Sequence, residues 1–294
     1  MNFPAHRLFR SLVTTLRAAE KFDKAHLSTP EVARLIGGAK YFYLEGYFLT
    51  HGLESAREVA KKASDSGKVH SHFTFQQHAP RTVLIFSQIF VLNLSAPFIP
   101  QFFKVQLEEL LPYCDFVIGN ESEAAAWAGA TGLPIKGDIP AIAGSIATLP
   151  KANPSRPRTV VITQGPESTV VVAAADPENP KIYPVTRLED GQIVDTNGAG
   201  DAFAGGFLGA LVAGKSVDEA VLAGHKLGGM CVQLVSTLKA HLAFDFLKGA
   251  AAGRTTVPLA KGGRVVDTLF SKVETLSALS GRNHYLLSTA VIGL

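Results

Sequence analysis

The sequence predicts an α/β fold in which a mainly parallel sheet is covered by helices. Two observations lead to this prediction. Short apolar runs rich in β-branched residues alternate along the chain with longer stretches of helical periodicity. In addition, 294 residues of which 47% are hydrophobic and 18% charged are enough for one large globular domain or two small ones.

The expected strands are short and apolar, and Pro-rich or Gly-rich turns separate several of them. A further apolar run, just before a glycine-rich turn, reads as one more short strand. We place the strands at residues 41–44, 91–95, 116–119, 159–163 and 169–173, with the additional run at 192–194.

The expected helices follow from apolar residues that recur at helical spacing. They cover residues 53–64, residues 139–149, a stretch from near Asn197 towards Gly214, and residues 217–235.

The last two of these helices are rich in glycine, and each glycine weakens an isolated helix by about 1 kcal/mol. Ser216 is a good N-cap for the second helix, which has acids in its first turn. We therefore expect the two helices to pack at close backbone distance. The glycines concerned are Gly205, Gly206, Gly209, Gly228 and Gly229.

Composition and charge exclude several classes of partner. A net charge of +3 without a dense basic block does not favour nucleic acid as a partner. The two cysteines, Cys114 and Cys231, argue against a disulfide framework and a multi-cysteine metal site, and they fit a reducing compartment. The apolar stretch 83–99 contains polar residues and Pro97, so we reject a membrane span.

Residues 1–22 hold three arginines and no acid before Glu20. An ordinary amphipathic helix and a mitochondrial transit peptide share this pattern. We expect the ordinary helix, and the transit peptide stays open as the alternative.

The segment most informative about chemistry is DTNGAGD, residues 195–201, between the apolar run and a helical pattern. Gly198, Ala199 and Gly200 put small residues where backbone N–H groups at a helix N-terminus can approach an anion. A carboxylate beside a bound phosphoryl group repels it, so Asp201 makes sense as a general base for an attacking hydroxyl. The alternative is a glycine turn capped by an acid.

A second polar segment, GNESEA at residues 119–124, follows the strand expected at 116–119. Ligands of open α/β sheets bind at the carboxyl ends of strands. Taken alone, the segment is more typical of a helix start with acids in its first turn.

DTNGAGD followed by AFAGGF resembles the signature of the ribokinase-like carbohydrate and nucleoside kinases, the PfkB family. This resemblance implies a three-layer α/β/α fold, with Asp201 as the catalytic base and the amides of Gly198, Ala199 and Gly200 as the anion hole. It also implies that Asn197 lies beside the phosphates of ATP. Asn120 and Glu123 match the family's Asn-x-x-Glu motif, which acts on the phosphates and, through water, on Mg²⁺.

The same resemblance assigns further roles. Thr163, Gln164 and Gly165 are similar to the family's nucleotide-binding turn, although a plain β-turn is the alternative. His225 matches a position in the adenine pocket of ATP, although a lone helical histidine more often packs. Tyr47 takes the place of an aromatic that stacks on the substrate's base, although such a residue is more often strand core.

Longer runs, including NLSAPFIPQFF and YCDFVIGNESEAAAWA, are similar to the adenosine kinase branch of the family. This similarity implies transfer of the γ-phosphoryl group of ATP to the 5′-hydroxyl of adenosine. The implied partners are adenosine and ATP, with Mg²⁺ as cofactor. We expect a monomer in the cytoplasm, without nucleic acid or membrane partners, and the nucleus stays open as a second location.

The sequence departs from the family pattern in three places. The resemblance starts near Arg10, without the family's Gly-Gly nucleoside motif or its lid strands, so residues 1–235 read as a partial kinase domain. Residues 70–89 read as an atypical insert, and 236–294 as an atypical tail. A faulty gene model with a truncated start, retained intron and shifted ending would explain all three. The alternative functions are a catalytically impaired nucleotide-binding fragment and a kinase of another nucleoside or sugar.

Overall fold

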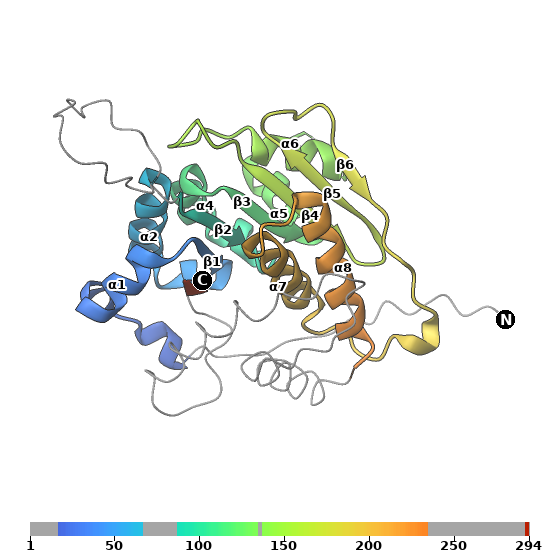
Figure 1. The fold of residues 1–294 in the computed structure, drawn as a ribbon. Helices are drawn as coiled ribbons and strands as arrows, with labels where there is room; N and C mark the ends of the chain where they lie inside the picture. The colour runs from blue at the N-terminus through green and yellow to red at the C-terminus, as the bar shows by residue number, and fades with distance from the viewer. Residues whose placement is uncertain (1–16, 67–86, 135–136, 235–291, 294) are drawn as a thin grey trace, which may run out of the picture.

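The computed structural model describes residues 17–66, 87–134, 137–234 and 292–293. One sheet holds all strands of this part of the chain, in the order β6-β5-β4-β3-β2-β1-β7 (Figure 1). The strands are β1 (Tyr41–Glu45), β2 (Ile89–Asn93), β3 (Phe116–Asn120), β4 (Thr159–Gln164), β5 (Glu167–Ala173), β6 (Lys181–Tyr183) and β7 (Ile292–Gly293).

The four central strands run parallel. β1 pairs with β2, β2 with β3 and β3 with β4 in parallel register, whereas β5, β6 and β7 join the sheet antiparallel. The carboxyl ends of β1 to β4 therefore lie along one edge of the sheet, which is where open α/β sheets bind ligands.

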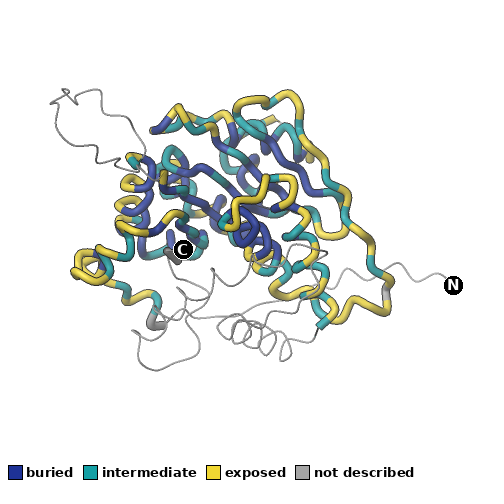
Figure 2. Tube along the Cα trace, in the orientation of Figure 1, coloured by how far each residue is buried: buried dark blue, intermediate teal, exposed yellow. Residues whose placement is uncertain are grey.

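Helices cover both faces of the sheet, because alternate side chains of each strand enter different hydrophobic clusters. One cluster joins the sheet to α2, α4, α5 and α6, and the other joins it to α7 and α8 (Figure 1). The central strands β1 to β4 are among the most buried segments (Figure 2). The α-helices are α1 (Pro30–Gly38), α2 (Leu53–Asp65), α3 (Phe98–Phe102), α4 (Lys104–Leu110), α5 (Glu121–Thr131), α6 (Ile139–Ala147), α7 (Ala199–Val212) and α8 (Val217–Val232).

Short 3₁₀ turns complete the described elements. They are η1 (Arg17–Lys21), η2 (Lys24–Ser28), η3 (Gly46–Thr50), η4 (Leu111–Tyr113) and η5 (Asp190–Gln192). The three-layer α/β/α architecture and the mainly parallel sheet are confirmed.

All five main strand predictions are found, with shifted ends. β2 starts and ends two residues earlier than expected, and its earlier end precedes Ser95, whose φ of 68° does not fit a strand. The strand predicted at 192–194 is wrong. The N–H groups of Val194 and Asp195 donate to the carbonyl of Val232 at the end of α8, so this segment makes no sheet ladder.

The four predicted helices are also found. α6 ends two residues and α8 three residues before the predicted ends. α1, α3, α4 and the short strands β6 and β7 were not predicted from the sequence.

The insert predicted at 70–89 lies largely outside the described residues, and so does the predicted tail except for β7. The last two residues of the insert belong to the fold. Gln88 is buried and donates to the carbonyls of Ile36 and Ala39 at the end of α1, and Ile89 starts β2. Within the described residues, no helix combines the length and apolarity needed to cross a membrane.

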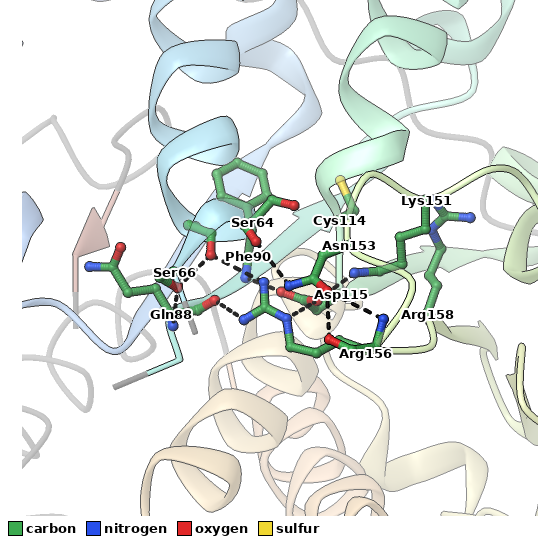
Figure 3. Close-up of polar contacts among 12 residues, drawn as sticks. Ser64, Ser66, Gln88, Phe90, Cys114, Asp115, Lys151, Asn153, Arg156 and Arg158 are labelled. Atoms are coloured by element: carbon green, nitrogen blue, oxygen red, sulfur yellow. Dashed lines mark hydrogen bonds and ion pairs between the residues drawn. The ribbon is translucent and has the colours of Figure 1, made fainter. Parts of the chain in front are cut away.

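A buried polar cluster ties the amino ends of β2, β3 and β4 together (Figure 3). Asp115, just before β3, accepts a hydrogen bond from the N–H of Phe90 at 3.0 Å and pairs with Lys151 Nζ at 2.7 Å. Arg156 Nε lies 3.3 Å from the same carboxylate, and its guanidinium donates to the carbonyl of Gln88. The cluster thus fixes the end of the sheet opposite the carboxyl edge.

Arg158, the residue before β4, is completely buried and donates hydrogen bonds to the helix ends around it. Its guanidinium donates to main-chain carbonyls at the end of α6 and in η4, including Ile146 at 2.8 Å and Leu111 at 2.5 Å. Helix C-termini leave carbonyls without partners and carry partial negative charge, so a buried cation is stabilised there.

We expect Asp115→Asn to lower the free energy of unfolding by about 3 kcal/mol, because Lys151 would lose its buried counter-charge. Urea unfolding of the purified chain measures this loss. Asp218→Asn is the matched control, since Asp218 pairs with Lys181 on the exposed surface and should change stability little. Equal losses in the two variants would contradict the structural role of Asp115.

α7 and α8 approach each other at backbone distance, as their glycines predicted. A Cβ added to Gly206 would lie 2.6 Å from the carbonyl oxygen of Ala223. A Cβ added to Gly224 would lie 2.7 Å from the ring of Phe203. By contrast, Gly205 faces open space, so the close approach explains only part of the glycine content.

Gly206→Ala should therefore destabilise the chain by about 1–3 kcal/mol, because the new methyl group forces the two helices apart. Gly205→Ala, the neighbouring control, should leave stability unchanged or raise it by up to about 1 kcal/mol through helix propensity. Thermal unfolding of both variants checks the pair, and a loss in Gly205→Ala as large as in Gly206→Ala would refute the packing argument.

Candidate active site

The carboxyl edge of the sheet brings several predicted residues together. The parallel registers place Glu45 beside Asn93 and Asn120 beside Thr163. Asp201, in the first turn of α7, influences the pKa values of Tyr43, Glu45 and Glu123 electrostatically, so the start of α7 lies over the same edge.

The turn before α7 has the conformation that an anion site needs. Gly198 is the N-cap, with φ 74°, a left-handed conformation that favours glycine. Among the described residues, no acceptor meets the N–H groups of Gly198, Gly200 or Asp201. The Ala199 amide, also predicted for the anion hole, donates to the carbonyl of Thr196 at 3.3 Å.

Two contacts stabilise this turn. The N–H of Asn197 donates to Asp195 Oδ1 at 2.9 Å. The thiol of Cys231, on α8, donates to the carbonyl of Asn197 at 3.5 Å and lies 3.7 Å from where a Gly198 Cβ would be. Cys231 thus has a packing role at the turn, which the sequence analysis did not identify.

Asp201 is exposed at the start of α7, but atoms around it remove part of its hydration. Burial by neighbouring atoms raises its pKa above the usual value of 3.8. A carboxylate with a raised pKa is a better proton acceptor, which suits a general base.

Asn120 and Glu123 bind each other in a capping box at the start of α5. Asn120 Oδ1 accepts from the N–H of Glu123 at 2.9 Å, and Glu123 Oε2 accepts from the N–H of Asn120 at 2.9 Å. Asn120 Nδ2 also donates to Glu123 Oε1 at 2.8 Å. The simpler interpretation of GNESEA, a helix start with acids in its first turn, is therefore confirmed, and the predicted contacts with ATP and Mg²⁺ remain predictions.

Glu123 is buried, and burial is the main reason why its pKa rises to about 7. The Asn120 N–H opposes this rise, while Glu45, Glu121 and Asp201 add to it. Gly119 leaves room for the carboxylate, since an added Cβ would lie 3.1 Å from Glu123 Oε2.

A polar group that the sequence analysis missed joins the carboxyl ends of β1 and β2. The Glu45 carboxylate accepts short hydrogen bonds from the hydroxyls of Tyr43 and Ser95. Asn93 Nδ2 donates to the Tyr43 hydroxyl at 2.9 Å, and Asn93 Oδ1 accepts from the N–H of Ser95 at 3.1 Å. A glutamate that ends an apolar strand, as in YFYLE, is the sequence feature that could have indicated it.

Tyr47 lies in η3, the turn that follows β1, rather than in the strand. Its ring is half-buried and lies 5.8 Å from the ring of Phe98, tilted by 54°. Phe98 starts α3 and is 38% exposed. The two aromatic side chains give the carboxyl edge an apolar surface, and Phe98 was not predicted.

Thr163, Gln164 and Gly165 lie at the hairpin between β4 and β5. Gly165 has φ 58°, and Gln164 Nε2 donates to the carbonyl of Ser168 at 2.6 Å. The β-turn alternative is thus confirmed as local structure, and the nucleotide contact stays a prediction.

His225, on α8, packs against α7 and β5. Its Nε2 lies 2.7 Å from Thr169 Oγ1, and its ring lies 5.8 Å from that of Phe203. Burial lowers the pKa of His225, so the neutral form is favoured. These contacts account for the histidine as a packing residue, and its predicted role in binding ATP stays a prediction.

The donors at this edge fit Mg²⁺ only through water. Three carboxylates, Glu45, Glu123 and Asp201, lie near one another, and oxygen is the donor that Mg²⁺ prefers. However, both Glu123 oxygens already accept hydrogen bonds, and no group of three ligating residues within the described ranges is placed to hold a metal. The binding of Mg²⁺ near Glu123 through water, which the sequence resemblance implied, stays a prediction.

A mainly parallel open sheet defines a ribokinase-like α/β protein when a helix starts over its carboxyl edge with an aspartate and with amides that have no acceptor among the described residues. The sequence profile of the pfkB family carbohydrate kinases matches residues 9–241. The chain therefore belongs to the pfkB family.

Similar proteins come from several kingdoms. An adenosine kinase of Schizophyllum commune is 53% identical over 226 residues, which cover 77% of this chain and 60% of the relative. The crystal structure of Anopheles gambiae adenosine kinase with P1,P4-di(adenosine-5) tetraphosphate has a TM-score of 0.66 and 38% identity, over 76% of this chain and 59% of the other. Schistosoma mansoni adenosine kinase with 2-fluoroadenosine has a TM-score of 0.63 and 31% identity, over 73% and 56%. The chain thus spans about 60% of the relatives' length.

The raised pKa of Glu123 predicts a pH dependence of stability. Because the pKa of about 7 in the folded chain exceeds the usual 4.5, the folded state holds this proton more tightly than the unfolded state. The free energy of unfolding should therefore fall as pH rises from 4.5 to 7, by at most about 1.4 kcal/mol per pH unit from this group.

Glu123→Gln cannot titrate and should lose this slope while shifting stability by a constant amount. Urea unfolding of both proteins at several pH values gives the difference between them. A difference that does not change between pH 4.5 and 7 would show that burial leaves the Glu123 pKa at its usual value.

Proposed function

We propose that the chain is an adenosine kinase, or the larger part of one, which transfers the γ-phosphoryl group of ATP to the 5′-hydroxyl of adenosine. The observation that carries the proposal is Asp201 beside the unpaired amides of the α7 turn, at the carboxyl edge of the sheet. The 53% identity to a fungal adenosine kinase supports the choice of substrate.

In this mechanism the protein mainly positions groups and stabilises charge. Asp201 accepts the proton of the 5′-hydroxyl, whose oxygen forms the new bond to the γ-phosphorus as the bond to the leaving ADP oxygen breaks. The Gly198 and Gly200 amides stabilise the negative charge on the transferring oxygens.

The rest of the edge supplies the binding surfaces. Tyr47 and Phe98 offer aromatic faces for the base of the nucleoside, since purines stack well on such rings. Mg²⁺, held through water near Glu123, would screen the charge of the ATP phosphates. AMP formation of this kind belongs to purine salvage in the cytoplasm or nucleus, and two free thiols are compatible with a reducing compartment.

A second candidate function is nucleotide binding without efficient transfer. It is favoured by the length, since the chain spans 60% of the relative from Schizophyllum commune. AMP formation from adenosine and ATP, together with calorimetric binding of each ligand, separates the two functions. ATP binding without turnover selects the second, and turnover of another nucleoside or a sugar instead of adenosine selects a different acceptor.

Asp201→Asn should reduce the rate of AMP formation by about 10²–10⁴-fold, because it removes the base but leaves the turn intact. The ATP affinity should stay within a few-fold of the original value. Asp218→Asn, an exposed acid in the first turn of α8, is the control and should retain full activity. Wild-type turnover in Asp201→Asn would disprove the assignment of the base.

A further inference from the structure

The side chains that join β1 and β2 at the carboxyl edge form one connected group. We call Tyr43, Glu45, Asn93 and Ser95 the Glu45 latch. Besides the hydrogen bonds from Tyr43 and Ser95 to Glu45, the Gly46 N–H donates to Ser95 Oγ at 2.7 Å. The Ser95 hydroxyl therefore bridges the Glu45 carboxylate and the main chain of the turn after β1.

The latch holds backbone in a conformation that it would not adopt freely. Ser95 has φ 68°, and it is the one non-glycine residue with positive φ among those the structure describes. Its N–H and hydroxyl are both bonded within the latch. Gly46 approaches the next strand so closely that an added Cβ would lie 2.6 Å from the carbonyl oxygen of Leu94.

Each of the two joined turns leads directly into an aromatic residue. Tyr47 follows Gly46 in η3, and Phe98 follows Ser95 by three residues at the start of α3. Their rings are 5.8 Å apart, and the phenyl ring of Phe98 carries no hydrogen-bonding group that could fix this distance. The latch is the polar link between the segments that carry them.

We propose that Glu45 is a positioning residue for the acceptor, whose carboxylate holds the Tyr47 and Phe98 rings in place through Ser95 and Gly46. That the acceptor is adenosine rests on the proposed function. That Glu45 holds the two rings in place does not depend on it. The role lies in hydrogen-bond geometry rather than in negative charge. A glutamine at position 45 would preserve it, since its oxygen accepts from Tyr43 and its nitrogen donates to Ser95.

The test compares Glu45→Ala and Glu45→Gln in the full chain, with Glu31→Ala on the exposed start of α1 as the control. Glu45→Ala should raise the KM and Kd for adenosine by about 10–100-fold, change kcat less, and leave ATP affinity unchanged. Glu45→Gln should stay within about threefold of the original protein. A Glu45→Gln defect as large as that of Glu45→Ala would overturn the proposal, because charge would then be the requirement.

Hydrogen exchange provides a readout that does not depend on activity. Amides of residues 46–50 and 95–102 should exchange faster in Glu45→Ala than in the original chain or in Glu31→Ala. Unchanged exchange would overturn the proposal. If Glu45→Ala does not fold, Ser95→Ala removes the bridging hydroxyl and should show the same local increase. A chain that binds no adenosine refutes the proposed function, and exchange still decides whether Glu45 holds the two turns.

Discussion

The parallel pairing of β1 to β4 is the constraint on which the candidate site depends. Parallel register ends these strands at the same edge, and the start of α7 lies over that edge, so residues 156 positions apart in the chain, Glu45 and Asp201, influence each other. At the opposite edge, Asp115 binds the N–H of Phe90 at the start of β2, and Arg158, just before β4, binds the carbonyl of Leu111 in η4. Buried charged side chains thus fix the amino ends of the strands, and the candidate active site lies at their carboxyl ends.

The local patterns predicted the fold well because each central strand is an apolar run and long helices such as α2 have a periodic apolar face. The pattern failed at 192–194, where three residues that look like a strand bond to the end of α8 instead. It also missed α3 and α4, which are short and follow Pro97 closely. Such elements are defined by tertiary contacts, which periodicity does not record.

The sequence predicted those parts of the candidate site that lie within one short motif. It missed the parts that residues from distant segments form together. DTNGAGD contains the turn, the amides and the acid within seven residues, so its geometry could be inferred from the sequence alone. Asn-x-x-Glu is also local, but its two side chains proved to bind each other. Glu45 and Ser95 are 50 positions apart, and only the register of β1 on β2 brings them together.

The close contact of α7 with α8 couples the anion turn to a distant part of the surface. Helices whose backbones touch at Gly206 and Gly224 cannot slide past each other without a clash, so they behave as one rigid body. Any ligand that draws the amides before α7 inward must carry α8 along. Asp218 on α8 also pairs with Lys181 on β6 at the surface, so α8 contacts the outer strand of the sheet as well as α7.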